Sequence, residues 1–145
     1  MKNAAPLEVK VNNIVYRIST VILTIFLVGG AFTYLSGSER IQVAFSNEMT
    51  DGYNAIGFPA WLIIPMAIMK LAGALAIWIP LVPKWLREWA YAGIFFNMFL
   101  AIGAHVFNPI NPEDSDLIAI LPFVMVIVSR VTLAAKERSL TKSEV

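Results

Sequence analysis

A few polar residues interrupt the apolar stretches of this sequence, and they are the residues that could do chemistry. Lys70 lies near the middle of IPMAIMKLAGALAIWIP (residues 64–80), and Asn97 and the only histidine, His105, lie in the next apolar stretch. An amine or a side-chain amide can donate hydrogen bonds to a carbonyl or an anionic group. These three residues are therefore our candidate ligand-binding residues.

Catalytic and metal sites need groups of residues that the sequence does not offer. It has no cysteine and one histidine, so a nucleophile–base–orienter set, a haem ligand pair or a zinc site is not expected. The acidic cluster Glu113-Asp114-Ser115-Asp116 resembles a helix cap more than a metal cage. We expect no catalytic residue, no metal and no certain cofactor, and we keep a bound quinone open.

The composition indicates a chain that faces lipid. Of its 145 residues, 58% are hydrophobic and 14% charged, against roughly 45–50% and about 25% in soluble domains. The length suits a single domain spanning residues 1–145. The basic residues are scattered and form no dense stripe, which argues against nucleic acid as a partner. The lipid bilayer is the expected partner.

Four segments are apolar enough to cross a membrane, which takes about 20 residues each. They span about 13–35, 59–79, 86–107 and 117–135, and prolines mark several of their ends. We therefore predict an all-α, integral membrane four-helix bundle. The outer loop, residues 36–58, is the longest connection, and we leave open whether it contains a short interfacial helix or is irregular.

The charges predict an orientation for this bundle. Basic residues concentrate at the two termini and in the loop between the second and third spans, whereas acidic residues dominate the other two loops, which hold one basic residue, Arg40. The positive-inside rule then places both termini and the loop between the second and third spans on the cytoplasmic side of the membrane.

Lys70 lies too deep in the second span to reach water. Eleven residues separate it from Pro59 and ten from Pro80, so its Cα is about 15 Å from either end. A charge facing lipid at that depth costs at least about 2.5–3.5 kcal/mol. We therefore expect Lys70 to face the bundle interior, on a helix face that Ala67, Gly73 and Ala74 keep narrow enough for close packing.

The third span should return antiparallel to the second through a tight loop near Pro83. That arrangement brings Lys70 level with Asn97 and Gly73 level with Ile94. On the third span, small or polar residues recur every four positions, and we expect this stripe to pack on the second span; it comprises Gly93, Asn97, Ala101 and His105.

Two interpretations of Lys70 stay open. In the structural one, Lys70 and Asn97 hold the helices together, with the lysine neutral or bonded to backbone carbonyls. In the functional one, they line a polar pocket open to the outer side, with His105 at its mouth, and Lys70 binds an anionic or carbonyl-bearing ligand. Of the other polar residues, Glu88 is expected to be a solvated inner charge, and Thr20 and Thr24 are expected to bond carbonyls of their own helix.

Three stretches of the sequence resemble the DoxX-like family of small bacterial membrane proteins: GFPAW (57–61), MKLAGALAIWIP (69–80) and REWAYAGIFFN (87–97). The resemblance is closest between residues 57 and 116, and Arg87 stands where the family usually has lysine. It implies a four-helix membrane bundle. Some members are named as membrane subunits of quinone-linked systems, and others are linked to oxidative-stress complexes or act as assembly chaperones.

Our leading functional hypothesis is a non-enzymatic, multi-pass protein of the bacterial inner membrane that acts as an accessory or assembly partner. Its polar intramembrane pocket would hold a lipid-like or quinone-like molecule, and it would contact a membrane-protein partner. One alternative is a membrane subunit of a quinone-linked oxidoreductase, in which Lys70 bonds a quinone oxygen. The other is a small transporter, which at this length would need to form a homo-oligomer.

Overall fold

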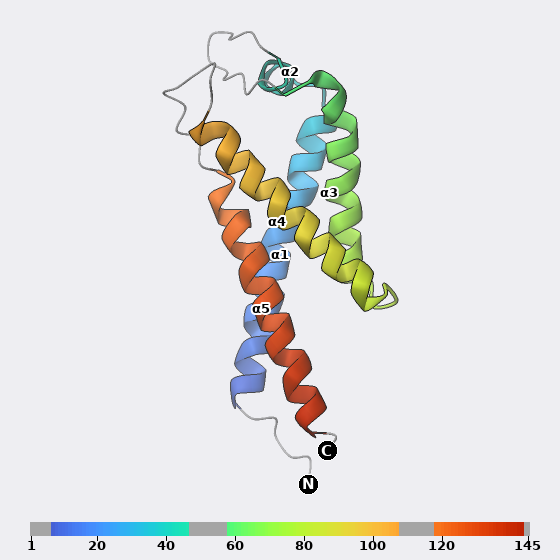
Figure 1. Cartoon of the computed structure of the whole chain (residues 1–145), viewed down its shortest axis with the longest axis vertical. Helices are drawn as coiled ribbons and strands as arrows, with labels where there is room; N and C mark the ends of the chain where they lie inside the picture. Colours follow the sequence, from blue (N-terminus) through green and yellow to red (C-terminus); the bar gives the residue numbers. More distant parts are fainter. Residues whose placement is uncertain (1–6, 47–57, 108–117, 144–145) are drawn as a thin grey trace.

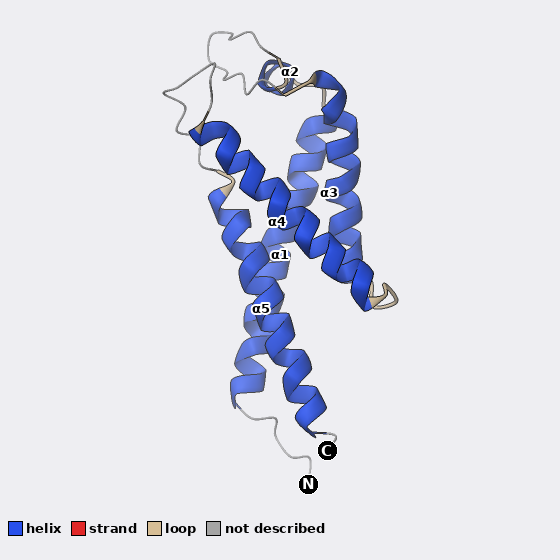
Figure 2. Ribbon diagram, in the orientation of Figure 1, coloured by secondary structure: helices blue, strands red, loops and turns tan. Residues whose placement is uncertain are grey.

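The computed structural model describes residues 7–46, 58–107 and 118–143. Every regular element in these segments is a helix, as Figures 1 and 2 show. In chain order they are α1 (Leu7–Leu35), α2 (Glu39–Ala44), the 3-10 helix η1 (Ala60–Leu62), α3 (Ile63–Trp78), α4 (Lys84–Val106) and α5 (Ile120–Ser143). The predicted all-α fold is confirmed.

The four long helices pack in a ring. Helix α1 packs along both α5 and α3, and α4 completes the ring by contacting α3 and α5. Figure 1 shows α1 and α5 running side by side, while α4 crosses the bundle obliquely from the end of α3 toward the start of α5. As a result, the ends of α3 and α4 that are far from their connecting loop are widely separated.

Three helical segments of the described chain are long and apolar enough to cross a membrane: α1, the continuous segment Ala60–Trp78, and α4. The predicted fourth span, residues 117–135, begins just outside the described residues. Its helix, α5, carries Arg130, Lys136 and Glu137 within its first eighteen residues, so it is less apolar than the others and is held in the ring by its packing on α1 and α4. The chain is a helical membrane protein.

Two helices extend beyond the predicted spans. Helix α1 begins at Leu7, six residues before the predicted start, and its 29 residues are about 43 Å long, against about 30 Å for the hydrocarbon core. Helix α5 continues to Ser143 through the good helix formers Ala134 to Arg138. Hydropathy marks the part of a helix that lipid can cover, whereas backbone hydrogen bonding continues into the polar region beyond it.

The start of α1 and the end of α5 lie at the same end of the molecule, and the loop between α3 and α4 turns toward it (Figure 1). We call this the inner end and the opposite one the outer end. An even number of long helices explains why both chain ends meet there. Its assignment to the cytoplasm stays a prediction.

The outer end carries the short helix α2, which favours the interfacial helix over an irregular loop for this part of the connection. Ile41 of α2 and Phe45, which directly follows α2, are buried against Ile63 of α3. The Phe45 ring meets the Tyr34 ring edge-on at 5.4 Å between centroids. Aromatic contacts therefore anchor α2 across the outer ends of α1 and α3. The rest of this connection, residues 47–57, lies outside the described residues.

The core lies between the four long helices. Buried apolar residues from each of them form one cluster: Leu23, Leu27, Ala74, Ile77, Tyr91, Ile94, Met98, Val126 and Leu133. Many other large apolar side chains remain exposed on the outside of the ring, Ile18, Ile68 and Phe96 among them. In a membrane protein these side chains contact lipid, so the exposure carries no hydrophobic penalty.

Candidate functional site

The site is built on one hydrogen bond between α3 and α4. Lys70 Nζ donates to Asn97 Oδ1 at 2.9 Å. One turn along α3, a Cβ placed on Gly73 would lie 3.2 Å from Ile94 Cδ1, so the two helices touch closely there. These are the two pairs that the sequence predicts for a tight antiparallel hairpin: Lys70 with Asn97, and Gly73 with Ile94. The predicted register of the second span against the third is confirmed.

Helix α1 forms the third side of the site, with a glycine and an aromatic ring. A Cβ placed on Gly30 would lie 3.7–3.9 Å from Lys70 Cδ, Cε and Nζ, so the lysine stem packs directly over this glycine. One turn further along, the Tyr34 ring lies under the amine, with 5.3 Å between Nζ and the ring centroid. At that distance the face of the ring attracts a cation. Lys70 therefore faces the bundle interior.

The amine keeps hydrogen-bonding capacity for a ligand. A lysine ammonium has three N–H donors, and one of them bonds Asn97. Among the described residues no carboxylate lies within ion-pair distance of Lys70. A charged Lys70 amine would have only the Asn97 oxygen and the Tyr34 ring, among the described residues, to offset the cost of removing it from water. This arrangement favours an incoming group that accepts hydrogen bonds or carries negative charge.

A large pocket of about 990 Å³ opens toward the outer end from this amine. Its walls come from α1, α2, α3, α4 and the start of α5, and most of its lining is apolar. The three candidate ligand-binding residues, Lys70, Asn97 and His105, all line it, together with Tyr34 and Ala101. The structure thus gathers the three candidates around one cavity, with Lys70 and Asn97 at its deep end.

A second, smaller pocket of about 310 Å³ lies on the inner side of the same pair, between α3 and α4. We call it the α3–α4 crevice. Apart from Lys70 and Asn97 its lining is apolar and includes Met69, Trp89 and Gly93. Met69 is 66% exposed and Trp89 is 70% exposed, so the crevice opens on the side of the ring that meets lipid. Lys70 and Asn97 line both pockets and stand at their junction.

The five residues predicted for close helix packing have different surroundings. Ala67 and Ala74 are buried, and Gly73 makes the close contact with α4 described above. Ala101 lines the outer pocket. The prediction is wrong for Gly93, because it is exposed and a Cβ there would have no described atom within 4 Å. The oblique course of α4 turns Gly93 toward the crevice, away from a neighbouring helix.

The sequence profile of the DoxX-like family matches residues 18–131 of the chain. The chain belongs to the DoxX-like family. Searches of curated proteins and of solved structures found no match.

The match to the DoxX-like family runs from within α1 to within α5, well beyond the stretch of closest resemblance in the sequence. It therefore takes in all four helices of the ring, both pockets and the three candidate ligand-binding residues. The candidate site lies wholly inside the part of this protein that its family defines.

The contributions of α1 to the site were missed by the sequence analysis. Gly30 and Tyr34 lie in an apolar run whose periodicity fixes no partner helix. The expectation for Thr20 is also wrong: its hydroxyl lies 2.7 Å from Ser129 Oγ, which lies 2.8 Å from the Tyr91 hydroxyl. Thr24 does bond its own helix, at Thr20 O. The spacing of serine and threonine shows no such pairing, because the partners are on helices far apart in the sequence.

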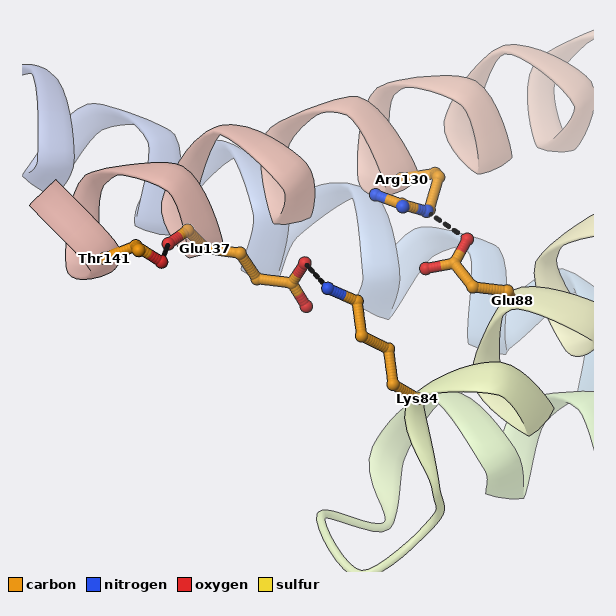
Figure 3. A network of polar contacts seen from close by, with 5 residues as sticks. All are labelled: Lys84, Glu88, Arg130, Glu137 and Thr141. Carbon is orange, nitrogen blue, oxygen red and sulfur yellow. Dashed lines mark hydrogen bonds and ion pairs between the residues drawn. The ribbon is translucent and has the colours of Figure 1, made fainter.

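Ion pairs tie α4 to α5 at the inner end (Figure 3). Arg130 Nε donates to Glu88 Oε2 at 2.7 Å, and Lys84 Nζ lies 3.1 Å from Glu137 Oε2. Glu88 is therefore a paired, half-buried charge, and the expectation of a solvated one is wrong. Its partner comes from the helix that returns alongside, so position in the sequence alone does not reveal it.

Proposed function

We propose that this protein is an accessory or assembly partner of the bacterial inner membrane that holds a lipid-like or quinone-like molecule in its outer pocket. Lys70 and Asn97 hydrogen-bond the polar group of this molecule, and apolar residues around them contact the rest. The chain performs no catalysis of its own. One observation carries the proposal. The Lys70 amine lines the outer pocket, and its hydrogen-bond acceptor among the described residues is a single neutral group, the Asn97 amide oxygen.

The dimensions of the outer pocket support this proposal. Its volume of about 990 Å³ lies at the upper end of the roughly 300–1,000 Å³ typical of small-molecule sites. Such sites are mostly apolar with a few polar groups that fix orientation. Lys70, Asn97, Tyr34 and His105 are polar groups of that kind in an otherwise mostly apolar lining.

The distribution of charge supports the membrane assignment and the orientation. The inner end carries the basic residues Lys84, Arg87 and Arg130, two of them in ion pairs with acidic partners. Arg87 also donates to the Ile79 carbonyl at 3.3 Å, beyond the end of α3. Basic side chains near helix ends favour the cytoplasmic face of a membrane, which in this proposal is the cytoplasmic face of the bacterial inner membrane.

The direct test is native mass spectrometry of the protein purified in mild detergent, as wild type and as Lys70→Met. Methionine keeps the length of the side chain and removes the donors. The expected result is a defined small-molecule adduct on the wild type that is lost in Lys70→Met. Lys84→Met is the matched control, since Lys84 is an exposed lysine at the inner end that lines neither pocket, and it should retain the adduct.

The identity of the adduct separates the neighbouring hypotheses. A quinone mass would favour the alternative of a subunit in a quinone-linked oxidoreductase. Equal phospholipid adducts on wild type and Lys70→Met, with normal folding of both, would contradict the proposed pocket and leave Lys70 as a structural contact between α3 and α4.

A further inference from the structure

The junction between the two pockets indicates how a ligand would lie. The outer pocket is lined by several polar side chains: Tyr34, His105, Asn97 and Lys70. The α3–α4 crevice has no charged or amide side chain other than Lys70 and Asn97, which line both pockets. A molecule with one polar end and one apolar end fits across this junction in a single direction. Its polar end meets the spare donors of Lys70, and its apolar end lies in the crevice.

The crevice is also open to the membrane. Met69 and Trp89 flank it and are mostly exposed. There is also open space at Gly93, where a Cβ would have no described atom within 4 Å. An apolar chain can therefore enter from the bilayer without crossing water. The crevice volume of about 310 Å³ lies at the low end for small-molecule sites, which suits one chain better than the two chains of a phospholipid.

We propose that the α3–α4 crevice is the chain-binding subsite and lateral entrance for a single-chain membrane amphiphile whose head accepts hydrogen bonds from Lys70. Gly93 is the specificity-determining residue, because the missing side chain there leaves the crevice open. This inference rests on the proposed function, and adds to it the class of ligand, its direction and its route of entry. A carboxylate and a quinone carbonyl share the required head chemistry.

The test uses Gly93→Leu in the full-length protein in detergent. A Cβ at this position would have no described atom within 4 Å, and the rest of the leucine would extend into the crevice, so the fold should be kept while the crevice is filled. Gly103→Leu is the matched control: Gly103 lies on the same helix, also has no described atom within 4 Å, and lines neither pocket. Both substitutions replace a helical glycine and raise helix propensity equally.

The probes are hexadecanoate, octanoate and a benzoquinone with a ten-carbon chain, each titrated onto delipidated protein and followed by native mass spectrometry. Wild type and Gly103→Leu should bind hexadecanoate or the quinone, whichever head the site takes, with equal affinity. Gly93→Leu should bind that probe roughly tenfold or more weakly, since the chain must compete with the leucine for space. If the site takes the carboxylate, Gly93→Leu should still bind octanoate but no longer prefer hexadecanoate to it, a result that a general loss of folding would not produce.

The outcomes distinguish this inference from the proposed function. If Lys70→Met loses the probe but Gly93→Leu keeps wild-type affinity, the outer pocket binds the ligand and the crevice inference is overturned. If no variant differs from wild type, both are overturned. If Gly103→Leu weakens binding as much as Gly93→Leu, the effect does not depend on the crevice and the inference is likewise overturned.

Discussion

The contact between Lys70 and Asn97 allows a sharp prediction, because its two partners should respond unequally to removal. In Asn97→Leu the amine loses its hydrogen-bond acceptor and keeps only the Tyr34 ring among the described residues. A hydrogen bond to a charged group contributes about 1.5–3 kcal/mol, so the free energy of unfolding should fall by about that amount. In the double variant Lys70→Met/Asn97→Leu both polar groups are gone, and an apolar pair of similar shape is nearly neutral.

The prediction is therefore a rescue. Adding Lys70→Met to Asn97→Leu should restore at least about 1 kcal/mol, although two damaging substitutions would normally add. The measurement is the free energy of unfolding in mixed micelles titrated with SDS, followed by circular dichroism. The protein must be delipidated first, because a bound ligand would stabilise the wild type by mass action.

Two results would refute this reasoning. Asn97→Leu with wild-type stability would mean that water in the pockets already satisfies the amine. A double variant less stable than Asn97→Leu would mean that the lysine stem, packed over Gly30, contributes more through its apolar contacts than its charge costs.

Three further predictions concern the packing around the site, all measured as free energies of unfolding by the same titration. Ser129→Ala should cost about 1–3 kcal/mol because it leaves two buried hydroxyls, on α1 and α4, without their shared partner; a loss below about 0.5 kcal/mol would contradict the network. Gly73→Leu should cost about 1–3 kcal/mol by overpacking against α4, whereas Gly93→Leu should leave stability within about 0.5 kcal/mol; equal effects would show that the crevice is closed. Glu88→Gln and Arg130→Gln should be non-additive by about 0.5–1 kcal/mol at low salt and by less at high salt; strict additivity would show that the pair is not formed.

The register of α3 against α4 could be predicted because a short loop leaves few choices. Once Pro83 is taken as the turn, counting outward along two antiparallel helices pairs Lys70 with Asn97 and Gly73 with Ile94, and both contacts form. The energetic rule that keeps a charge away from lipid then decides which face of the helix turns inward. Local geometry and one large energy term are enough for this half of the site.

The other half of the site depends on helix orientation, which the sequence does not specify. Residues 25–32 of α1, IFLVGGAF, carry no polar stripe that marks an inner face, so the sequence does not point to Gly30 or to Tyr34 just beyond it. The same limitation explains the error at Gly93. Spacing every four residues predicts a common face, but the crossing angle of α4 decides whether that face touches α3 at one end or along its whole length.

The structure also bears on the two interpretations of Lys70. This protein has a second intramembrane polar cluster, in which the hydroxyls of Thr20, Ser129 and Tyr91 join α1, α5 and α4 with each hydroxyl bonded to another. Neutral groups that satisfy one another hold helices together at low cost. Lys70 differs in every respect that matters: it can carry charge, has donors to spare, and stands where two pockets meet. Holding helices together requires none of these properties, whereas each of them suits a residue that binds the polar end of an amphiphile, as we propose.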